Sequence, residues 1–511
     1  MTWQVVNGDN IAWLQALPDG CVDAIVCDPP YGLSAEPDMR QVLTHWLAGD
    51  DYQHRGGGFM GRSWDSFVPG PSTWRECLRV LRPGGHMLAF GGTRTYDLLV
   101  TAVRLAGFEI RDTIAWLYGA GFPKSLDVSK AIDRVAGVER EIVATGAPAK
   151  RMTPGADQEA TGSWIKDDGR EYLPTVTRPA TAEASRWEGW GTALKPAHEP
   201  IVVARKPLVS TVAANVIAHG TGALNIDACR VDAGGDSLGG GAEKVTTREQ
   251  KGNDGWASPW MDDEEAREAH AARVRANVTR AEALGRWPAN VALDPDAAVA
   301  LDAQTGELRS GDGNIIRESS ADHGGNRSSA FGAESRKAGE VMVSYGDRGG
   351  ASRFFYCAKT APEEREAGLD GLPVTDAPTT TSPTSTLQHG RTGSRRVDER
   401  IPERAARAND HPTVKPIELM RWLIRLVTPP GGVVLDPFCG SGSTGCAAVL
   451  EGADFLGVDL DEHYCDIAIA RIGWWARQDA RPAEHTVRAA ARARADHAAR
   501  TDHGQLAMEA L

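Results

Sequence analysis

The hydrophobic pattern of the chain predicts short buried strands separated by amphipathic segments. Each predicted strand is a mostly apolar run of three to six residues, bounded by turn-forming or polar residues. These strands are Trp3–Val6, Val22–Cys27, Met87–Phe90, Asp112–Leu117, Ile201–Ala204, Val433–Leu435 and Phe455–Val458. A helical pattern over Thr444–Glu451 lies between the last two. Strands that alternate with helices predict an α/β fold with a doubly wound, mostly parallel sheet.

Two long regions lack this periodicity. Residues 119–195 and 210–400 are rich in Gly, Ser, Thr and Pro. Within the second region, residues 375–396 hold too few apolar side chains to form a core, which predicts a flexible linker. The tail, residues 476–511, alternates Ala with charged residues, a pattern that fits either a solvated helix or a disordered segment.

Composition narrows the class of protein. The 511 residues are 41% hydrophobic and 24% charged, as in ordinary globular proteins. The chain lacks the apolar run of roughly 20 residues that a membrane helix needs, and its start lacks the pattern of an export signal. Its eight cysteines are scattered without zinc-ligand spacing. These features predict a cytoplasmic protein with reduced thiols and no metal.

The net charge of the chain indicates whether nucleic acid is a suitable binding partner. A formal net charge of −13 argues against nucleic acid, since phosphate contacts need Lys and Arg. Between Arg391 and Arg425, however, nine basic residues face five acidic ones. A local positive face on an acidic protein therefore remains open.

Two short segments carry the candidate chemistry. Asp28-Pro29-Pro30-Tyr31-Gly32 directly follows the second predicted strand, and Asp436–Thr444 directly follows the sixth. In an open α/β sheet, ligands bind beyond the carboxyl ends of the strands, where the strand order reverses. The two segments are therefore predicted to be two walls of one active site.

The second segment has the features of a nucleotide-binding loop. Gly440 and Gly442 allow a tight turn and close approach to a ligand, and Asp459 ends the next strand, where a carboxylate can accept hydrogen bonds from ribose hydroxyls. Without that carboxylate, a plain tight turn would explain the glycines equally well. With it, an adenosine-containing ligand is favoured.

The first segment suits an aromatic amine. Its prolines stiffen the loop, so that the Asp28 carboxylate and the Pro29 carbonyl can hold both hydrogens of an amino group whose lone pair is otherwise delocalised. Tyr31 offers a flat face for a base extruded from a duplex. An ordinary Pro-Pro turn with a helix-capping Asp is the alternative.

With Asn409–Pro416, which reads Asn-Asp-His-Pro-Thr-Val-Lys-Pro, these segments resemble the β class of DNA amino-methyltransferases. In that class the catalytic loop precedes the cofactor loop. The resemblance extends to Gly8-Asp9-Asn10, Arg82–Gly85, Ala197-His198-Glu199-Pro200, Gly457–Asp459 and Tyr464, and other stretches resemble phage and prophage members. It implies a seven-stranded, Rossmann-like fold of class I S-adenosylmethionine-dependent methyltransferases with large variable insertions. It also implies S-adenosylmethionine as cofactor and double-stranded DNA as substrate.

The resemblance assigns roles to individual residues. The catalytic set is Asp28, Pro29, Pro30 and Tyr31. The cofactor-binding set is Asp9 at the adenine amino group, Asp459 at the ribose, Phe438, Gly440 and Gly442 at the methionine end, Thr413 and Lys415 closing that end, and Asp436 and Ser441 in the same loop. Many relatives carry Glu where this chain has Asp459, whose shorter side chain is still expected to reach the ribose.

The target atom has two candidates within this family. Adenine N6 is favoured, because Ser usually replaces the first Asp in enzymes that methylate cytosine N4. Cytosine C5 needs a thiolate that adds to the ring, and no cysteine here follows a proline as in those enzymes. Cys439 and Cys446 are expected to be packing residues, and His411 to make a structural hydrogen bond. A non-catalytic DNA-binding protein on the same scaffold is the alternative from another class.

The predicted organisation follows from these assignments. It comprises a catalytic half (1–118), an insertion (119–195), a strand returning to the core (196–208), a variable target-recognition region (209–400), a cofactor-binding half (409–475) and the tail (476–511). The resemblance leaves open a homodimer and a companion restriction nuclease as partners.

Overall fold

The central feature of the computed structural model is a mixed β-sheet. The structure describes residues 2–34, 36–54, 63–119, 121, 125–145, 149–154, 165–172, 175–234, 263–309, 315–316, 341–342, 348–358, 362–370, 372 and 408–478. The predicted linker at 375–396 and nearly all of the tail lie outside these ranges. Among the described residues the sheet has nine strands in the order β1-β17-β16-β2-β3-β9-β4-β10-β15. They are β1 (Trp3–Asn7), β2 (Val22–Cys27), β3 (Leu81–Phe90), β4 (Glu109–Leu117), β9 (His198–Arg205), β10 (Val291–Leu293), β15 (Tyr356–Cys357), β16 (Val433–Asp436) and β17 (Asp454–Asp459).

The sheet is mostly parallel, and the α/β class is as predicted. All neighbouring strands pair in parallel except at β9, which runs antiparallel to both β3 and β4. Every strand predicted from the sequence is present, within three residues of its expected ends, except that β3 begins at Leu81, six residues before the expected Met87. The described sheet has two strands more than the seven that the resemblance implies, because β10 and β15 from the region 209–400 extend it beyond β4.

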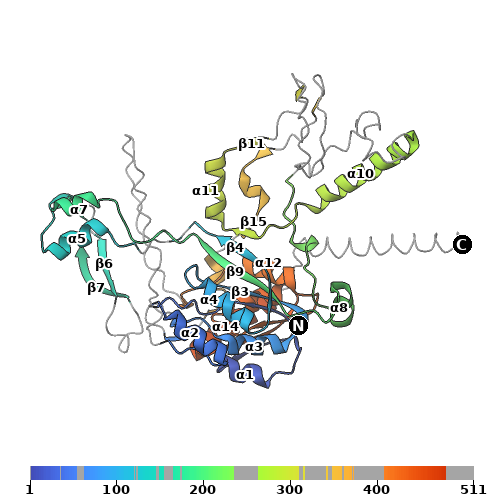
Figure 1. Cartoon of the computed structure of the whole chain (residues 1–511), viewed down its shortest axis with the longest axis horizontal. Coiled ribbons are helices and arrows are strands. Elements are labelled where there is room, and N and C mark those ends of the chain that lie inside the picture. Colours follow the sequence, from blue (N-terminus) through green and yellow to red (C-terminus); the bar gives the residue numbers. More distant parts are fainter. Residues whose placement is uncertain are drawn as a thin grey trace.

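Helices cover both faces of the sheet (Figure 1). α1 (Asn10–Ala16), α2 (Met39–Ala48), α3 (Pro71–Val80) and α4 (Tyr96–Leu105) contribute buried side chains to one face, and α12 (Ile417–Val427), α13 (Ser443–Leu450) and α14 (Glu462–Arg477) to the other. Side chains of successive strand residues point to opposite faces. In β2, Ala24 and Val26 accordingly pack under α12 and α13, whereas Ile25 and Cys27 pack under α1 and α3. Burial on both faces explains why this strand reads as a continuous apolar run.

The insertion stands outside this core, and much of the region 209–400 extends beyond it, although β10, β15 and the buried Cys229 of that region belong to the core (Figure 1). The insertion forms an outlying lobe of α5 (Val128–Ala136), α7 (Ala182–Arg186), β5 (Ile142–Thr145), β6 (Ala149–Pro154), β7 (Ile165–Tyr172) and β8 (Thr175–Thr177). The lobe is braced by Asp133, which accepts hydrogen bonds from Thr181 and pairs with Arg140 at 3.0 Å. The region 209–400 holds α8 (Val212–His219), α10 (Glu264–Leu284) and α11 (Pro295–Thr305), the short strands β11 (Leu308–Arg309), β12 (Ile315–Ile316), β13 (Val341–Met342) and β14 (Arg348–Gly349), and single helical turns over Asp227–Cys229, Ala351–Phe354 and Pro362–Arg365.

Strand direction brings distant segments to one edge of the sheet. β1, β2, β16 and β17 are parallel, with Asn7 opposite Asp459 and Asp436 opposite Gly457, so the loops after them emerge together. Because β9 is antiparallel, its amino end at His198 and Glu199 lies at this same edge, opposite Leu117 and Trp116 of β4. In the part of the chain that is described, no helix is both long and apolar enough to span a membrane.

Candidate active site

A cavity of about 1880 Å³ opens at this edge. Its lining includes every residue of the predicted catalytic set, and every residue of the predicted cofactor-binding set except Gly442. The segment Thr192–Glu199, which leads from the outlying lobe into β9, forms a further wall. Two loops about 400 positions apart in sequence therefore face a common space.

Asp28 follows β2 at the inner wall of the cavity. Its Oδ2 accepts a hydrogen bond of 2.5 Å from Lys415 Nζ, while its Oδ1 is buried and has no hydrogen-bond partner among the described residues. Burial raises the pKa of this carboxyl above its usual range, although the Lys415 charge acts to lower it. The Tyr31 hydroxyl also acts to lower the pKa of Asp28, but it donates to Glu199, and Asp28 Oδ1 remains a desolvated acceptor with no described group in hydrogen-bond geometry.

Tyr31 is held from both ends. Its backbone N–H donates to Asp65 Oδ1 at 2.7 Å, and its carbonyl accepts from Thr95 Oγ1 at 2.5 Å. Its hydroxyl donates to Glu199 Oε2 at 2.9 Å. Burial, together with the negative charges of Asp28 and Glu199, raises the pKa of Tyr31 well above its usual value. The ring is therefore a neutral wall of fixed orientation.

Lys415 links the Asp28 loop to the amino end of β9 electrostatically. Its side chain is 6% exposed, and its Nζ lies 3.4 Å from Glu199 Oε2 as well as against Asp28. Burial acts to lower the pKa of Lys415, but the two carboxylates outweigh it and the pKa is raised. This ammonium group lies between Asp28 and Glu199, and its place at the methionine end of the cofactor stays a prediction.

The glycine loop after β16 is braced by a buried carboxylate. Asp436 is 2% exposed. Its Oδ1 accepts from the Phe438 backbone N–H at 3.0 Å, and its Oδ2 accepts from Thr444 Oγ1 at 2.5 Å in the first turn of α13. Burial raises the pKa of Asp436 to about 7, against the lowering effect of these two donors. Asp436 therefore ties the start of the loop to the helix that follows.

The two glycines of the loop have different surroundings. Gly440 has φ 50°, and a Cβ there would lie 2.8 Å from His411 Nε2, so the backbone passes directly beneath that ring. Gly442 has φ 79° and precedes α13, where a Cβ would lie 2.8 Å from the Cβ of Ala468. Gly440 borders the cavity, whereas Gly442 permits close packing of α13 on α14.

Asp459 and Asp9 lie at the far end of the cavity from Asp28. Asp459 Oδ2 accepts from the Gly440 N–H at 2.7 Å and Oδ1 from the Asp461 N–H at 3.0 Å. Each carboxylate oxygen retains a second lone pair for a ligand hydroxyl. Burial raises the pKa of Asp459. Asp9 caps α1 by accepting from the Ala12 N–H at 2.8 Å, and it also lines the cavity.

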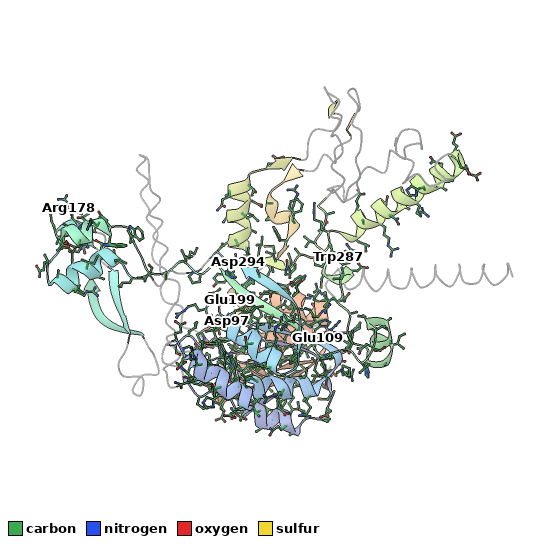
Figure 2. All side chains as sticks on the ribbon, in the orientation of Figure 1. Asp97, Glu109, Arg178, Glu199, Trp287 and Asp294 are labelled. Carbon is green, nitrogen blue, oxygen red and sulfur yellow. The ribbon has the colours of Figure 1, made fainter. Side chains whose placement is uncertain are left out.

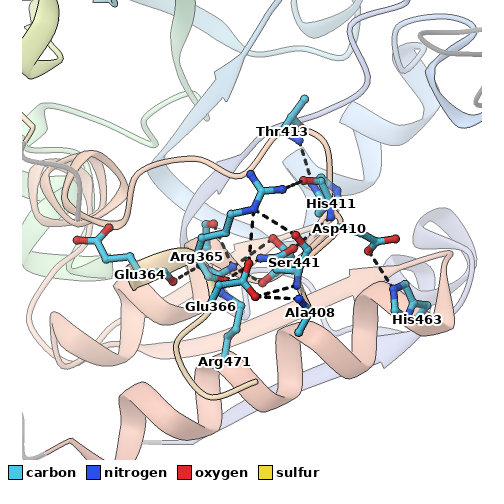
Figure 3. Close-up of polar contacts among 12 residues, drawn as sticks. Glu364, Arg365, Glu366, Ala408, Asp410, His411, Thr413, Ser441, His463 and Arg471 are labelled. Carbon is cyan, nitrogen blue, oxygen red and sulfur yellow. Dashed lines mark hydrogen bonds and ion pairs between the residues drawn. The ribbon is translucent and has the colours of Figure 1, made fainter. Parts of the chain in front are cut away.

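The loop that carries Thr413 and Lys415 is clasped by a segment from the region 209–400 (Figure 3). Arg365 donates to the carbonyls of Asn409 and His411, at 3.1 and 2.6 Å. Glu366 accepts from the backbone N–H groups of Ala408 and Asn409. The clasp fixes the His411 ring over Gly440 and against Tyr464, with ring centroids 4.6 Å apart.

A buried arginine connects this clasp to the glycine loop. Arg471 of α14 is fully buried and donates to the Ser441 carbonyl at 2.5 Å and to the Glu364 carbonyl at 3.2 Å (Figure 3). Ser441, predicted as a cofactor residue, is thus also held by its backbone. The segment Glu364–Glu366, the loop Ala408–Lys415 and helix α14 are thus joined to one another and to the glycine loop by hydrogen bonds.

Three site residues were absent from the predicted sets. Glu199 and Asp65 hold Tyr31, and Asn10 Nδ2 donates to the Pro437 carbonyl at 3.3 Å. In Figure 2, Glu199 lies over the central sheet, whereas Arg178 lies on the outlying lobe. The motifs around Glu199 and Asn10 resemble the family, which was the available signal. Nothing in the sequence around Asp65 marks it as a partner of Tyr31.

Cys439 and Cys446 are buried packing residues, as predicted. Of the nine basic residues that left a local positive face open, the six from Arg391 to Arg407 lie outside the described residues; Lys415 pairs with Asp28, and Arg421 and Arg425 both pair with Glu451. Among the described residues, no cluster of His, Cys, Asp and Glu is arranged to hold a metal.

Comparisons with known proteins identify the family. A family model described as DNA methylase matches residues 22–470. A DNA adenine methyltransferase of Escherichia coli K12, YhdJ, is 38% identical over 63 residues, which are 12% of this chain and 21% of that protein. YubD, named as a methylase in the same strain, is 48% identical over 54 residues, 11% of this chain and 24% of that protein. The chain thus spans about a quarter or less of the length of these curated relatives.

Solved structures of low similarity were also found. The PvuII DNA methyltransferase, which is cytosine-N4-specific, is 10% identical with a TM-score of 0.34 and covers 92% of this chain and 86% of its own. M1.HpyAVI is 11% identical with a TM-score of 0.31 and covers 92% and 98%. At these scores the two structures add no argument to the assignment. Because the family model matches residues 22–470, which are most of the chain, the chain belongs to the family of N6/N4 DNA methylases, as its motifs predict.

Proposed function

We propose that the chain transfers a methyl group from S-adenosylmethionine to the N6 of adenine in double-stranded DNA, on a base flipped out of the duplex. One observation carries the proposal. The Asp28-Pro29-Pro30-Tyr31 loop and the Asp436–Thr444 loop face one cavity, in which Asp28 Oδ1 is a buried acceptor without a partner among the described residues. Family membership supports the same chemistry.

The cavity suits the cofactor on its own chemistry. At one end, the Asp459 and Asp9 carboxylates can accept hydrogen bonds from ribose hydroxyls and an adenine amino group. Next to them, Gly440 leaves bare backbone at the wall, where a side chain would collide with His411. The Phe438 ring and the Ser441 backbone continue this wall toward Asp28. When bound, S-adenosylmethionine supplies an electrophilic methyl group.

The residues of the chain orient the substrate amine. Asp28 Oδ1 and the Pro29 carbonyl accept its two hydrogens, which turns the nitrogen lone pair away from the ring. Tyr31 stacks on the base, and the bound base and cofactor displace water from the cavity, so that positioning does most of the catalytic work. After the methyl group is attached, the nitrogen loses one proton. Asp28, whose pKa is raised by burial, accepts that proton at Oδ1 and passes it to solvent.

Adenine is proposed over cytosine because of the first residue of the loop. Asp28 supplies an anionic acceptor, whereas the cytosine-N4 members of the family usually have Ser at this position. Methylation of cytosine N4 is the second candidate, since a cytosine amino group needs the same two acceptors and a smaller pocket. Both readings give an enzyme that acts on an exocyclic amine.

Nucleoside analysis tests the proposal. Unmethylated DNA is incubated with the protein and labelled S-adenosylmethionine, then digested and separated. We expect labelled N6-methyladenine; N4-methylcytosine would establish the second candidate. Asp28→Ala is expected to lower kcat at least about a hundredfold, and Asp97→Asn, an exposed carboxylate on α4, serves as matched control. Label in neither base would favour a non-catalytic DNA-binding protein.

The remaining assignments stay predictions. The proposal requires double-stranded DNA as partner and a cytoplasmic location, and it assigns target recognition to the region 209–400. A homodimer is testable by light scattering in solution. A companion restriction nuclease is testable by whether methylated DNA resists cleavage in extracts of the source cell.

A further inference from the structure

We propose that Glu199 is a positioning residue, which holds Lys415 and Tyr31 so that Asp28 keeps one oxygen available for the substrate amine. The inference rests on the proposed function and extends it to a residue that the transfer chemistry above does not use. Glu199 touches neither reacting atom in that scheme. It acts through the two side chains that flank Asp28.

The position of Glu199 follows from strand direction. It lies near the amino end of β9, opposite Trp116 of β4, and its side chain is 20% exposed at the cavity wall. Only an antiparallel strand places an amino end at the edge where the parallel strands have their carboxyl ends. A carboxylate at that point reaches into the cavity from the side opposite the glycine loop.

Glu199 makes two contacts through one oxygen. Oε2 accepts from the Tyr31 hydroxyl at 2.9 Å and lies 3.4 Å from Lys415 Nζ. The same ammonium group is 2.5 Å from Asp28 Oδ2. Lys415 is thereby shared between two carboxylates, and its Nζ sits 5.4 Å from the centre of the Tyr31 ring. Rotation of Lys415 fully onto Asp28 would occupy Oδ1 as well as Oδ2, and Oδ1 is the oxygen that the substrate amine needs.

The charge balance of this group suits methyl transfer. Asp28 and Glu199 carry two negative charges, Lys415 carries one positive charge, and Tyr31 is neutral. The net charge of −1 faces the place where positive charge develops on the amine nitrogen. Preorganised charges in an enclosed site stabilise such a change more than water does. Without Glu199, Lys415 would neutralise Asp28 and leave no net charge.

Other charged or titratable groups face this cluster. They are Asp436 at the end of β16, which interacts with Asp28, and Tyr118 after β4, which interacts with Glu199 and Lys415. The Glu199 charge raises the pKa of Asp28, and the Lys415 charge lowers it. Asp28 must be ionised to accept from the amine, so kcat should fall at acid pH as Asp28 becomes protonated. Glu199 and Lys415 therefore shift the acid limb of the pH profile, the pH range over which kcat falls, in opposite directions.

The test compares variants by their pH profile. Glu199→Gln keeps an acceptor for Tyr31 but removes the charge; we expect kcat to fall at least about tenfold and the acid limb to move to lower pH. Glu199→Asp keeps the charge and is expected to retain the wild-type acid limb with part of kcat. Lys415→Met should move the limb to higher pH. Glu109→Gln removes a carboxylate that pairs with Arg205 at the opposite edge of the sheet and should change neither quantity.

The outcomes separate this inference from the proposed function. No methyl transfer by the wild-type protein would refute the proposed function, and the inference with it. Transfer by the wild type, with an unshifted acid limb in both Glu199→Gln and Lys415→Met, would refute the inference alone. If Glu199→Gln fails to fold, as judged by thermal unfolding, the remaining variants decide: relative to Glu109→Gln, the acid limb should be unshifted in Glu199→Asp and should lie at higher pH in Lys415→Met. A Lys415→Met limb at or below the wild-type pH would contradict the inference.

Discussion

The hydrogen bond between Thr444 and Asp436 offers a sharp test of how the glycine loop is held. Thr444→Val replaces the hydroxyl by a methyl group of nearly the same size. The change leaves Asp436 Oδ2 buried without the donor that now lies 2.5 Å away, while the apolar packing of α13 is kept. The cost is therefore that of one hydrogen bond to a charged group and no cavity.

The magnitude follows from the charge state of Asp436. A hydrogen bond to an ionised group contributes about 1.5–3 kcal/mol, against about 1 kcal/mol for a neutral one. Because burial raises the pKa of Asp436 to about 7, the carboxylate is mostly ionised at pH 8 and mostly protonated at pH 5. We expect Thr444→Val to lose about 2 kcal/mol at pH 8 and about 1 kcal/mol at pH 5. For a cooperative unit of 150–250 residues, the larger loss lowers Tm by about 4–8 °C.

Urea unfolding followed by tryptophan fluorescence at both pH values measures these losses. Thr444→Ser is the matched control, since it keeps the hydroxyl and removes only a methyl group. A Thr444→Val midpoint equal to that of wild type at pH 8 would refute the reasoning. So would a loss that is larger at pH 5 than at pH 8.

Three further predictions concern the same loop. Asp436→Asn removes the ionisable carboxyl group. The pKa of Asp436 is about 7 in the folded protein and about 3.9 in the unfolded chain. The folded wild-type protein therefore binds more protons than the unfolded chain between these values, and its stability falls as pH rises from about 4 to about 7. Over that pH range, the free energy of unfolding of Asp436→Asn should rise by up to about 4 kcal/mol relative to that of wild type, as measured by urea unfolding. A difference between the two proteins that does not change with pH would contradict this prediction. Gly442→Ala places a Cβ at φ 79° and against Ala468, so we expect the free energy of unfolding to fall by at least about 1 kcal/mol. Gly452→Ala is the control, because it has the same backbone strain at φ 78° but its Cβ would meet nothing within 4 Å. Equal losses of Tm in the two variants would show that the contact with Ala468 adds nothing to the strain. Arg471→Met leaves the Ser441 and Glu364 carbonyls without their donor and should weaken S-adenosylhomocysteine binding in calorimetry, which an unchanged affinity would disprove.

In the region 209–400, the hydrophobic pattern of the sequence did not predict the strands that the structure contains. β10 and β15 are only three and two residues long, too short for a periodicity of two to stand out from chance. β10 forms because it pairs with the otherwise free edge of β4, and β15 pairs in turn with β10. Similarly, the segment around Arg365 has no regular pattern, and its bonds to Asn409 and His411 join residues more than 40 positions apart.

The sequence by itself determined the local elements and the chemistry of the two loops. The strands before Asp28, Asp436 and Asp459 are buried on both faces, so their apolar runs are visible without knowledge of their neighbours. The carboxyl ends of parallel strands share one edge, and this rule alone predicted that the loops would meet. The tertiary structure decided what no local pattern encodes: that β9 runs antiparallel, that Glu199 thereby reaches Tyr31 and Lys415, and that Lys415 lies against Asp28. Those contacts span 168 to 387 positions, and they depend on the packing of whole elements and on the balance of buried charges, which exist only once the chain is folded.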